Sequence, residues 1–113
     1  MHELTIVLNI FEIAGNQLKE HQGNKIDAIE LEIGLLAGIE MEAFHFAWNA
    51  ALPGSVLEDC SLKINPVEAE ARCRHCHLEY DVSSLYDACP GCGSFRSELI
   101  RGKDLRIQSL VIS

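Results

Sequence analysis

Hydrophobic residues near the start of the chain recur at spacings of three and four. Over residues 4–21 the apolar stripe consists of Leu4, Val7, Leu8, Phe11, Ala14 and Leu18. This spacing follows the 3.6-residue turn of an α-helix, so we predict an amphipathic helix that packs this stripe against the core. Gly23 and Asn24 follow the last turn, and we expect them to end the helix.

The pattern changes to period two over residues 26–33, where apolar residues at 29, 31 and 33 enclose two glutamates. Such alternation predicts a strand with one buried face, and Gly34 and Gly38 frame the segment in which the chain leaves this strand. A second helical stripe then begins at Glu40 or Glu42 and runs to about Leu52. Its apolar members are Phe44, Ala47, Trp48 and Ala51.

Two further segments alternate, at residues 61–71 and 104–113. Pro66 interrupts the first, and because proline cannot donate to a strand ladder, we expect an edge or a bulge at Asn65-Pro66. In the second, the apolar phase changes between Ile107 and Leu110, which predicts a bulge there.

Between these segments lie two CxxC pairs, Cys73–Cys76 and Cys89–Cys92, with twelve residues between the pairs. Each pair offers two thiolates from one tight turn, and this separation is typical of a zinc ribbon. Zinc with four thiolates has no position left for water, so the predicted site is structural. Two disulfides or four thiols without metal remain the alternatives.

The second turn contains residues suited to presenting sulfur. Pro90 fixes one φ angle, and Gly91 and Gly93 allow the positive φ that such turns often need.

These elements predict an α+β fold, in which a small three-stranded sheet with two helices carries an inserted zinc-ribbon lobe. We expect an α+β domain from residues 1–70 and 103–113, and a zinc-ribbon domain from residues 71–102. A chain of 113 residues has room for one modest core, so the lobe would need its metal for stability.

Charge and cysteine content narrow the possible partners and the compartment. The net charge of −8 disfavours binding to a phosphate backbone, and no apolar run is long enough to span a bilayer. The first residues do not resemble a secretory leader, and together with five cysteines this favours the reducing cytoplasm. We expect Cys60 to be a free thiol.

A second metal site is suggested by Met1-His2-Glu3. The Met1 amine, the deprotonated His2 amide and the His2 imidazole can chelate one ion, and such nitrogen-rich sets suit Ni(II) or Cu(II). Glu3 would support the site as an outer or weak ligand. The alternative is an ordinary exposed terminus without metal.

Three motifs together resemble one family. Met1-His2-Glu3-Leu4, Leu31-Glu32-Ile33-Gly34 and the two CxxC pairs, the second as Cys89-Pro90-x-Cys92, are similar in order and distance to the HypA/HybF family of hydrogenase maturation factors. The resemblance implies a nickel metallochaperone, and not an enzyme, that helps to insert Ni(II) into the large subunit of [NiFe] hydrogenase. It also implies a HypB-type GTPase as partner and, in some organisms, a role with urease maturation proteins.

The same resemblance assigns residues. His2 is the nickel ligand, with the Met1 amine as co-ligand and Glu3 in support, whereas Zn(II) falls on Cys73, Cys76, Cys89 and Cys92. Glu40 is a candidate acidic neighbour of the nickel site. Metal binding by His45, His75 and His77, and a homodimer, are left open.

Two other classes of function compete with this prediction. A zinc-ribbon adaptor for protein interactions, without nickel function, would tolerate loss of His2 but not of Cys76. A metal-dependent hydrolase is disfavoured because the chain has no HExxH motif and its predicted zinc is already held by sulfur.

Overall fold

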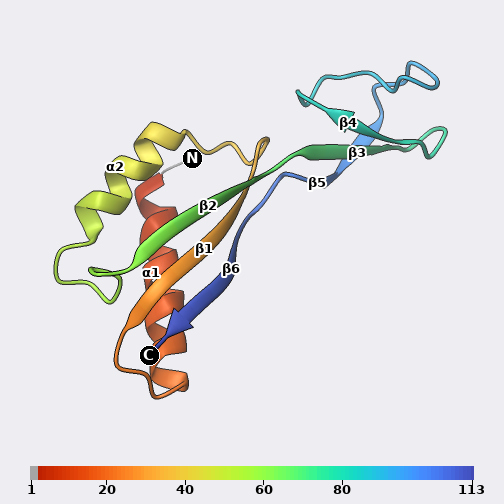
Figure 1. Cartoon of the computed structure of the whole chain (residues 1–113). Helices are drawn as coiled ribbons and strands as arrows, with labels where there is room; N and C mark the ends of the chain where they lie inside the picture. The colour runs from red at the N-terminus through yellow and green to blue at the C-terminus, as the bar shows by residue number, and fades with distance from the viewer. Residues whose placement is uncertain (1–2) are drawn as a thin grey trace. The chain divides into compact units, whose positions relative to one another are not determined.

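The computed structural model describes residues 3–113, which form two helices and two three-stranded sheets (Figure 1). Met1 and His2, on which the nickel prediction rests, lie outside the described residues. The chain divides into two compact units. The first comprises Met1–Leu31, Ile39–Ile64 and Ile107–Ser113, and the second comprises Glu32–Gly38 and Asn65–Arg106. The predicted domain limits at residues 71 and 102 stay a prediction.

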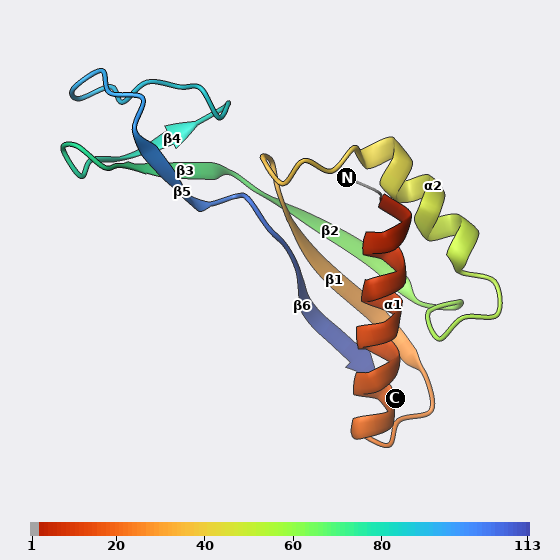
Figure 2. The ribbon, with the colours of Figure 1, turned by 180° about the vertical axis from the view of Figure 1, so that it is seen from behind.

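The two helices and the predicted sheet form as expected. The elements are α1 (Glu3–Glu20), α2 (Met41–Ala51), β1 (Ile26–Gly34), β2 (Ser61–Val67) and β6 (Leu105–Ile112). The sheet order is β2-β1-β6, so β1 is central. Strand β2 runs in the same direction as β1 and β6 runs against it, while α1 lies across one face of the sheet with α2 beside α1 (Figures 1 and 2). Neither helix is long and apolar enough to cross a membrane within residues 3–113.

The core of the first unit lies between α1, α2 and the sheet. Val7 and Ala14 of α1 are fully buried, as is Phe44 of α2. The rings of Phe11 and Trp48 meet edge to face with centroids 4.9 Å apart, which joins the two helices.

The buried stripe of α1 differs from the predicted one. Leu4 and Leu8 are each 52 % exposed, whereas Ile10, outside the predicted stripe, is buried. Isoleucines also stand at positions 6 and 13, so apolar residues surround much of the helix. Periodicity alone therefore could not decide which of them faces the core, and tertiary packing decides it.

Helix α1 ends where predicted, but through a different residue. Gln22 adopts the left-handed conformation with φ 54°. The Gly23 N–H donates to the Leu18 carbonyl at 3.0 Å and the Gln22 N–H to Lys19 at 3.1 Å, the two bonds of a Schellman cap. A Cβ at Gly23 would stand 2.2 Å from Ile112 Cγ2, so glycine is needed there for space.

The proline in β2 is accommodated at an edge of the sheet, as predicted. Strand β2 continues through Asn65-Pro66, and the chain leaves the strand pattern only at Glu68. The exposure pattern of β6 changes phase across Gln108 and Ser109, which are both exposed. The bulge expected there stays a prediction.

The second unit contains a sheet that the sequence did not predict. Its strands are β3 (Ala69–Cys73), β4 (Glu79–Val82) and β5 (Ser97–Arg101), in antiparallel order β4-β3-β5. The register of β3 on β5 shifts between Glu70 and Ala71. Strands this short leave almost no periodic signal, and the alternation over residues 61–71 predicts a single strand where the chain forms β2 and most of β3.

Two glycines of the second unit approach each other closely. The Gly34 N–H donates to Asp104 O and the Leu36 N–H donates to Gly102 O, each at 2.9 Å. A Cβ at Gly34 would lie 2.1 Å from the Gly102 carbonyl oxygen, which is backbone and cannot rotate away. By contrast, Gly38 has φ 76° and open space around it.

We therefore predict different costs for two similar substitutions. Gly34→Ala should lower the free energy of unfolding by about 2 kcal/mol or more, because the backbone must move. Gly38→Ala should cost about 1 kcal/mol, because only a left-handed backbone is disfavoured. Chemical denaturation of both variants checks this, and equal losses would contradict the close contact.

Candidate metal centre

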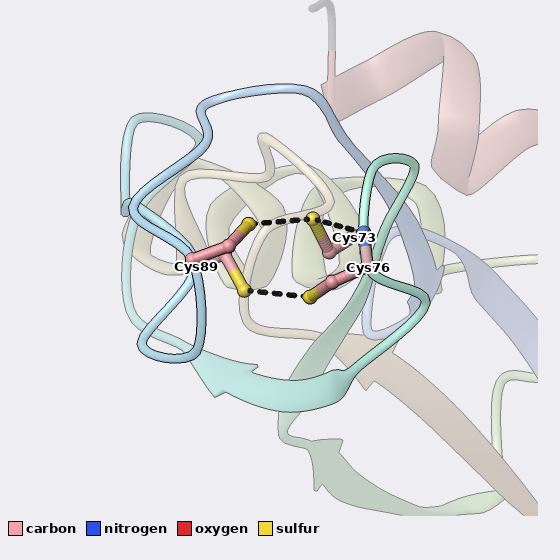
Figure 3. A group of neighbouring side chains, drawn as sticks. Cys73, Cys76 and Cys89 are labelled. Atoms are coloured by element: carbon pink, nitrogen blue, oxygen red, sulfur yellow. Dashed lines mark hydrogen bonds between the residues drawn. The ribbon is translucent and has the colours of Figure 1, made fainter.

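Four cysteine sulfurs converge in the second unit. The Sγ atoms of Cys73, Cys76, Cys89 and Cys92 all lie within 4.8 Å of one another. Cys73 Sγ is 3.6 Å from Cys92 Sγ, and Cys76 Sγ is 3.5 Å from Cys89 Sγ (Figure 3). These separations are far longer than the roughly 2 Å of a disulfide, and all five cysteines are free thiols. The two predicted pairs thus meet, and the disulfide alternative is wrong.

The two turns that present the sulfurs have the same backbone design. In each turn, the N–H of the residue after the second cysteine donates to the carbonyl of the first cysteine. The N–H of the first cysteine donates to the carbonyl of the residue five positions further along the chain. The four N–H···O bonds are His77 to Cys73 at 2.9 Å, Gly93 to Cys89 at 2.8 Å, Cys73 to Leu78 at 2.8 Å and Cys89 to Ser94 at 2.9 Å.

Each turn needs one left-handed residue, at the same place. Gly93 has φ 77° and His77 has φ 66°. Of the two glycines that allow a positive φ in the second turn, Gly93 adopts it and Gly91 does not. Gly91 instead provides close packing, because its N–H donates to Cys89 Sγ at 3.3 Å and a Cβ would lie 3.0 Å from Leu78.

Hydrogen bonds and burial separate the pKa values of the sulfurs. The backbone N–H groups of Cys76 and His75 each donate to Cys73 Sγ at 3.4 Å. These bonds, of which the Cys76 bond has the larger effect, lower the pKa of Cys73 to about 6, although burial acts to raise it. The Ser94 N–H favours the Cys92 thiolate, but partial desolvation and hydrogen bonds with the other three sulfurs raise the pKa of Cys92 to about 12.

Four thiolates as close together as these sulfurs would repel one another. A divalent cation at their centre reverses this effect, since it favours every thiolate at once. Cys73 and Cys89 are buried while Cys76 and Cys92 are exposed, so the cluster lies at the surface of the unit. The donor set fits a four-coordinate ion bound by sulfur.

Near the start of the chain, two glutamates are linked. The Glu40 N–H donates to Glu3 Oε2 at 3.1 Å. The Glu40 carboxylate caps α2, accepting from the N–H groups of Glu42 at 3.0 Å and Ala43 at 2.7 Å. The structure therefore brings Glu3 to Glu40. Glutamate is not among the usual N-cap residues, so capping rules could not reveal this link.

The imidazoles of the three histidines left open do not belong to the group of candidate metal ligands. His45 is exposed on α2 and contacts the edge of Phe44 with ring centroids 6.0 Å apart. His75 and His77 are exposed on the first cysteine turn. In the part of the chain that the structure describes, the candidate metal-holding group consists of the four cysteines alone.

Fold and site together define a small α+β protein that carries a ribbon with a four-thiolate metal centre. A sequence model of the family described as "Hydrogenase/urease nickel incorporation, metallochaperone, hypA" matches residues 1–112. The chain belongs to this HypA family, as its motifs indicated.

Relatives agree over the full length of the chain. Proteins named "Hydrogenase maturation factor HypA" are 36 % identical in Francisella philomiragia, covering 100 % of both chains, and 37 % identical in Chlorobaculum tepidum, covering 99 % of both. The solution structure of the Ni metallochaperone HypA from Helicobacter pylori superposes with a TM-score of 0.76 at 24 % identity, over 99 % of this chain and 97 % of the other. A second solution structure, of "HypA protein", also gives a TM-score of 0.76, at 25 % identity over 100 % and 97 % of the chains.

Because the two cysteine turns share one backbone design, we predict opposite changes in stability for substitutions at their left-handed residues. Gly93→Ala should lower the stability of the metal-loaded protein by about 1 kcal/mol, because no neighbour within 4 Å of a Cβ there adds to the backbone strain. His77→Gly should raise it by about 0.5 kcal/mol, since the strain it relieves is partly offset by chain entropy. Denaturation of both variants at equal metal content measures the difference, and a loss in His77→Gly would contradict the equivalence of the turns.

Proposed function

We propose that this protein is a nickel metallochaperone that binds Ni(II) at its N-terminus and delivers it for the maturation of [NiFe] hydrogenase. The observation that carries the proposal is the family match, which spans residues 1–112 and is described as nickel incorporation. Relatives of the same length, named hydrogenase maturation factors, support it.

The nickel ligands in this proposal are the Met1 amine, the His2 amide nitrogen and the His2 imidazole. They belong to consecutive parts of the chain, so they close small chelate rings without ordering a loop. Glu3 supports the site from α1. Its carboxylate already accepts the Glu40 N–H, which favours a positioning role toward α2 over direct ligation.

We assign Zn(II) to Cys73, Cys76, Cys89 and Cys92. Zinc–thiolate bonds of about 2.3 Å around a tetrahedral ion place neighbouring sulfurs roughly 3.8 Å apart. Two of the sulfur pairs are separated by 3.6 and 3.5 Å and all four sulfurs lie within 4.8 Å of one another, so the cluster supports this ion with little movement. Zinc here holds the ribbon and takes no part in transfer.

Delivery requires partners from the hydrogenase maturation machinery. A HypB-type GTPase and the hydrogenase large subunit are the proposed ones, with urease maturation proteins where the organism has them, since the family description includes urease. The cytoplasm is the proposed compartment, which suits five free thiols. Nickel leaves by ligand exchange, one nitrogen at a time, to a deeper site on the acceptor.

Nickel binding is tested by equilibrium dialysis of zinc-loaded protein. His2→Ala, and separately a short extension that blocks the Met1 amine, should each reduce nickel uptake by about tenfold or more, because each removes a chelating nitrogen. His45→Ala is the matched control, since this exposed imidazole lies on α2. Unchanged uptake in both altered proteins would refute the nickel site and leave the adaptor alternative.

The zinc assignment is tested separately. Cys76→Ala should abolish stoichiometric zinc and loosen the second unit, because three thiolates no longer enclose the ion. Cys60→Ala is the control, since Cys60 lies outside the cluster. Metal analysis after gel filtration provides the measurement. Full zinc retention by Cys76→Ala would overturn the assignment.

A further inference from the structure

A cleft of about 460 Å³ opens on the second unit, beside the cysteine turns. Its lining residues are Arg74, His75, Phe95, Arg96 and Ser97. Phe95 is 75 % exposed, so its side chain is available as an apolar contact surface at the cleft. No cysteine of the metal centre lines the cleft.

Backbone pairing places the two arginines of the cleft opposite each other. Strand β3 pairs with β5 so that Cys73 lies opposite Ser97. One position further out, the Arg74 N–H donates to the Arg96 carbonyl at 2.7 Å. Directly opposed residues of an antiparallel pair project from the same face, so both guanidinium groups belong to one surface.

The nearby carboxylates do not fully neutralise the charges of Arg74 and Arg96. Glu98 lies 3.7 Å from Arg74 and is shared with Arg72, at 3.9 Å. Arg96 has no carboxylate within ion-pair distance among residues 3–113. Directly opposed like charges destabilise each other, and an incoming carboxylate would remove that cost.

We propose that this cleft, formed by Arg74, His75, Phe95, Arg96 and Ser97, binds an acidic peptide segment of a partner protein. Carboxylates of the segment pair with Arg96 and Arg74, whose planar guanidinium groups suit bidentate contacts. An apolar side chain of the segment packs on Phe95. The cleft does not depend on the proposed nickel site, because it shares no residue with Met1, His2 or Glu3.

The small number of basic residues at the cleft favours a protein segment over a nucleic acid as the occupant. A phosphate backbone gains affinity by neutralising many phosphates along a basic track, which the lining residues of this cleft do not form. The cleft offers two arginines and one apolar surface. That combination matches a few spaced carboxylates next to an apolar side chain.

The test uses fluorescence anisotropy with a short labelled peptide in which glutamates flank two leucines. Arg96→Glu should weaken binding by about tenfold or more, equivalent to about 1.4 kcal/mol. Lys103→Glu makes the same charge change in the second unit at an exposed residue outside the cleft, and should weaken binding less than about twofold. Phe95→Ser should weaken the leucine-containing peptide but not an all-glutamate peptide.

Zinc content confirms that each variant remains folded. The bond between Arg74 and Arg96 is formed by backbone atoms, so it survives exchange of either side chain. Three results would overturn the proposal: no binding of the acidic peptide to the unaltered protein, equal losses in Arg96→Glu and Lys103→Glu, or equally tight binding of an oligothymidylate. The last result would identify a nucleic-acid surface.

Discussion

The second unit depends on holding four sulfur atoms within 4.8 Å of one another. Apart from Ile33, its buried apolar residues are small, namely Ala69 and Ala71 together with Cys73 and Cys89, whereas Leu85, Tyr86 and Phe95 are exposed. So little apolar burial contributes little to stability, and a bound ion supplies what the core lacks. The separated pKa values of Cys73 and Cys92 reflect the same need, because adjacent thiolates require a cation between them.

The sequence predicted the features that depend on local patterns. The helices and β1 followed from apolar spacing, and the metal cluster followed from two CxxC pairs at ribbon spacing. Pro66 indicated the edge strand correctly, because its missing N–H restricts where it can stand. In each case a physical rule links neighbouring residues directly to a conformation.

Features set by tertiary packing were missed. Gln22 and His77 adopt left-handed conformations that favour glycine, and no sequence rule singles them out. The exposure of Leu4 and Leu8 depends on where α2 and the sheet lie against α1. The Glu3–Glu40 hydrogen bond joins residues 37 positions apart, and a contact at that distance leaves no periodic trace. Such contacts result from the assembled fold.

The two proposed metal sites differ in what must move when an ion leaves. Cys73 is the last residue of β3 and pairs with Ser97 of β5, while its sulfur accepts the N–H groups of the turn. Loss of zinc therefore disturbs both turns and a sheet strand at once, which makes exchange slow. The proposed nickel ligands belong to two consecutive residues, so they close small chelate rings without ordering a loop. On the proposed assignments, zinc would join two turns that are distant in the sequence, whereas nickel would be held by one short segment of the chain.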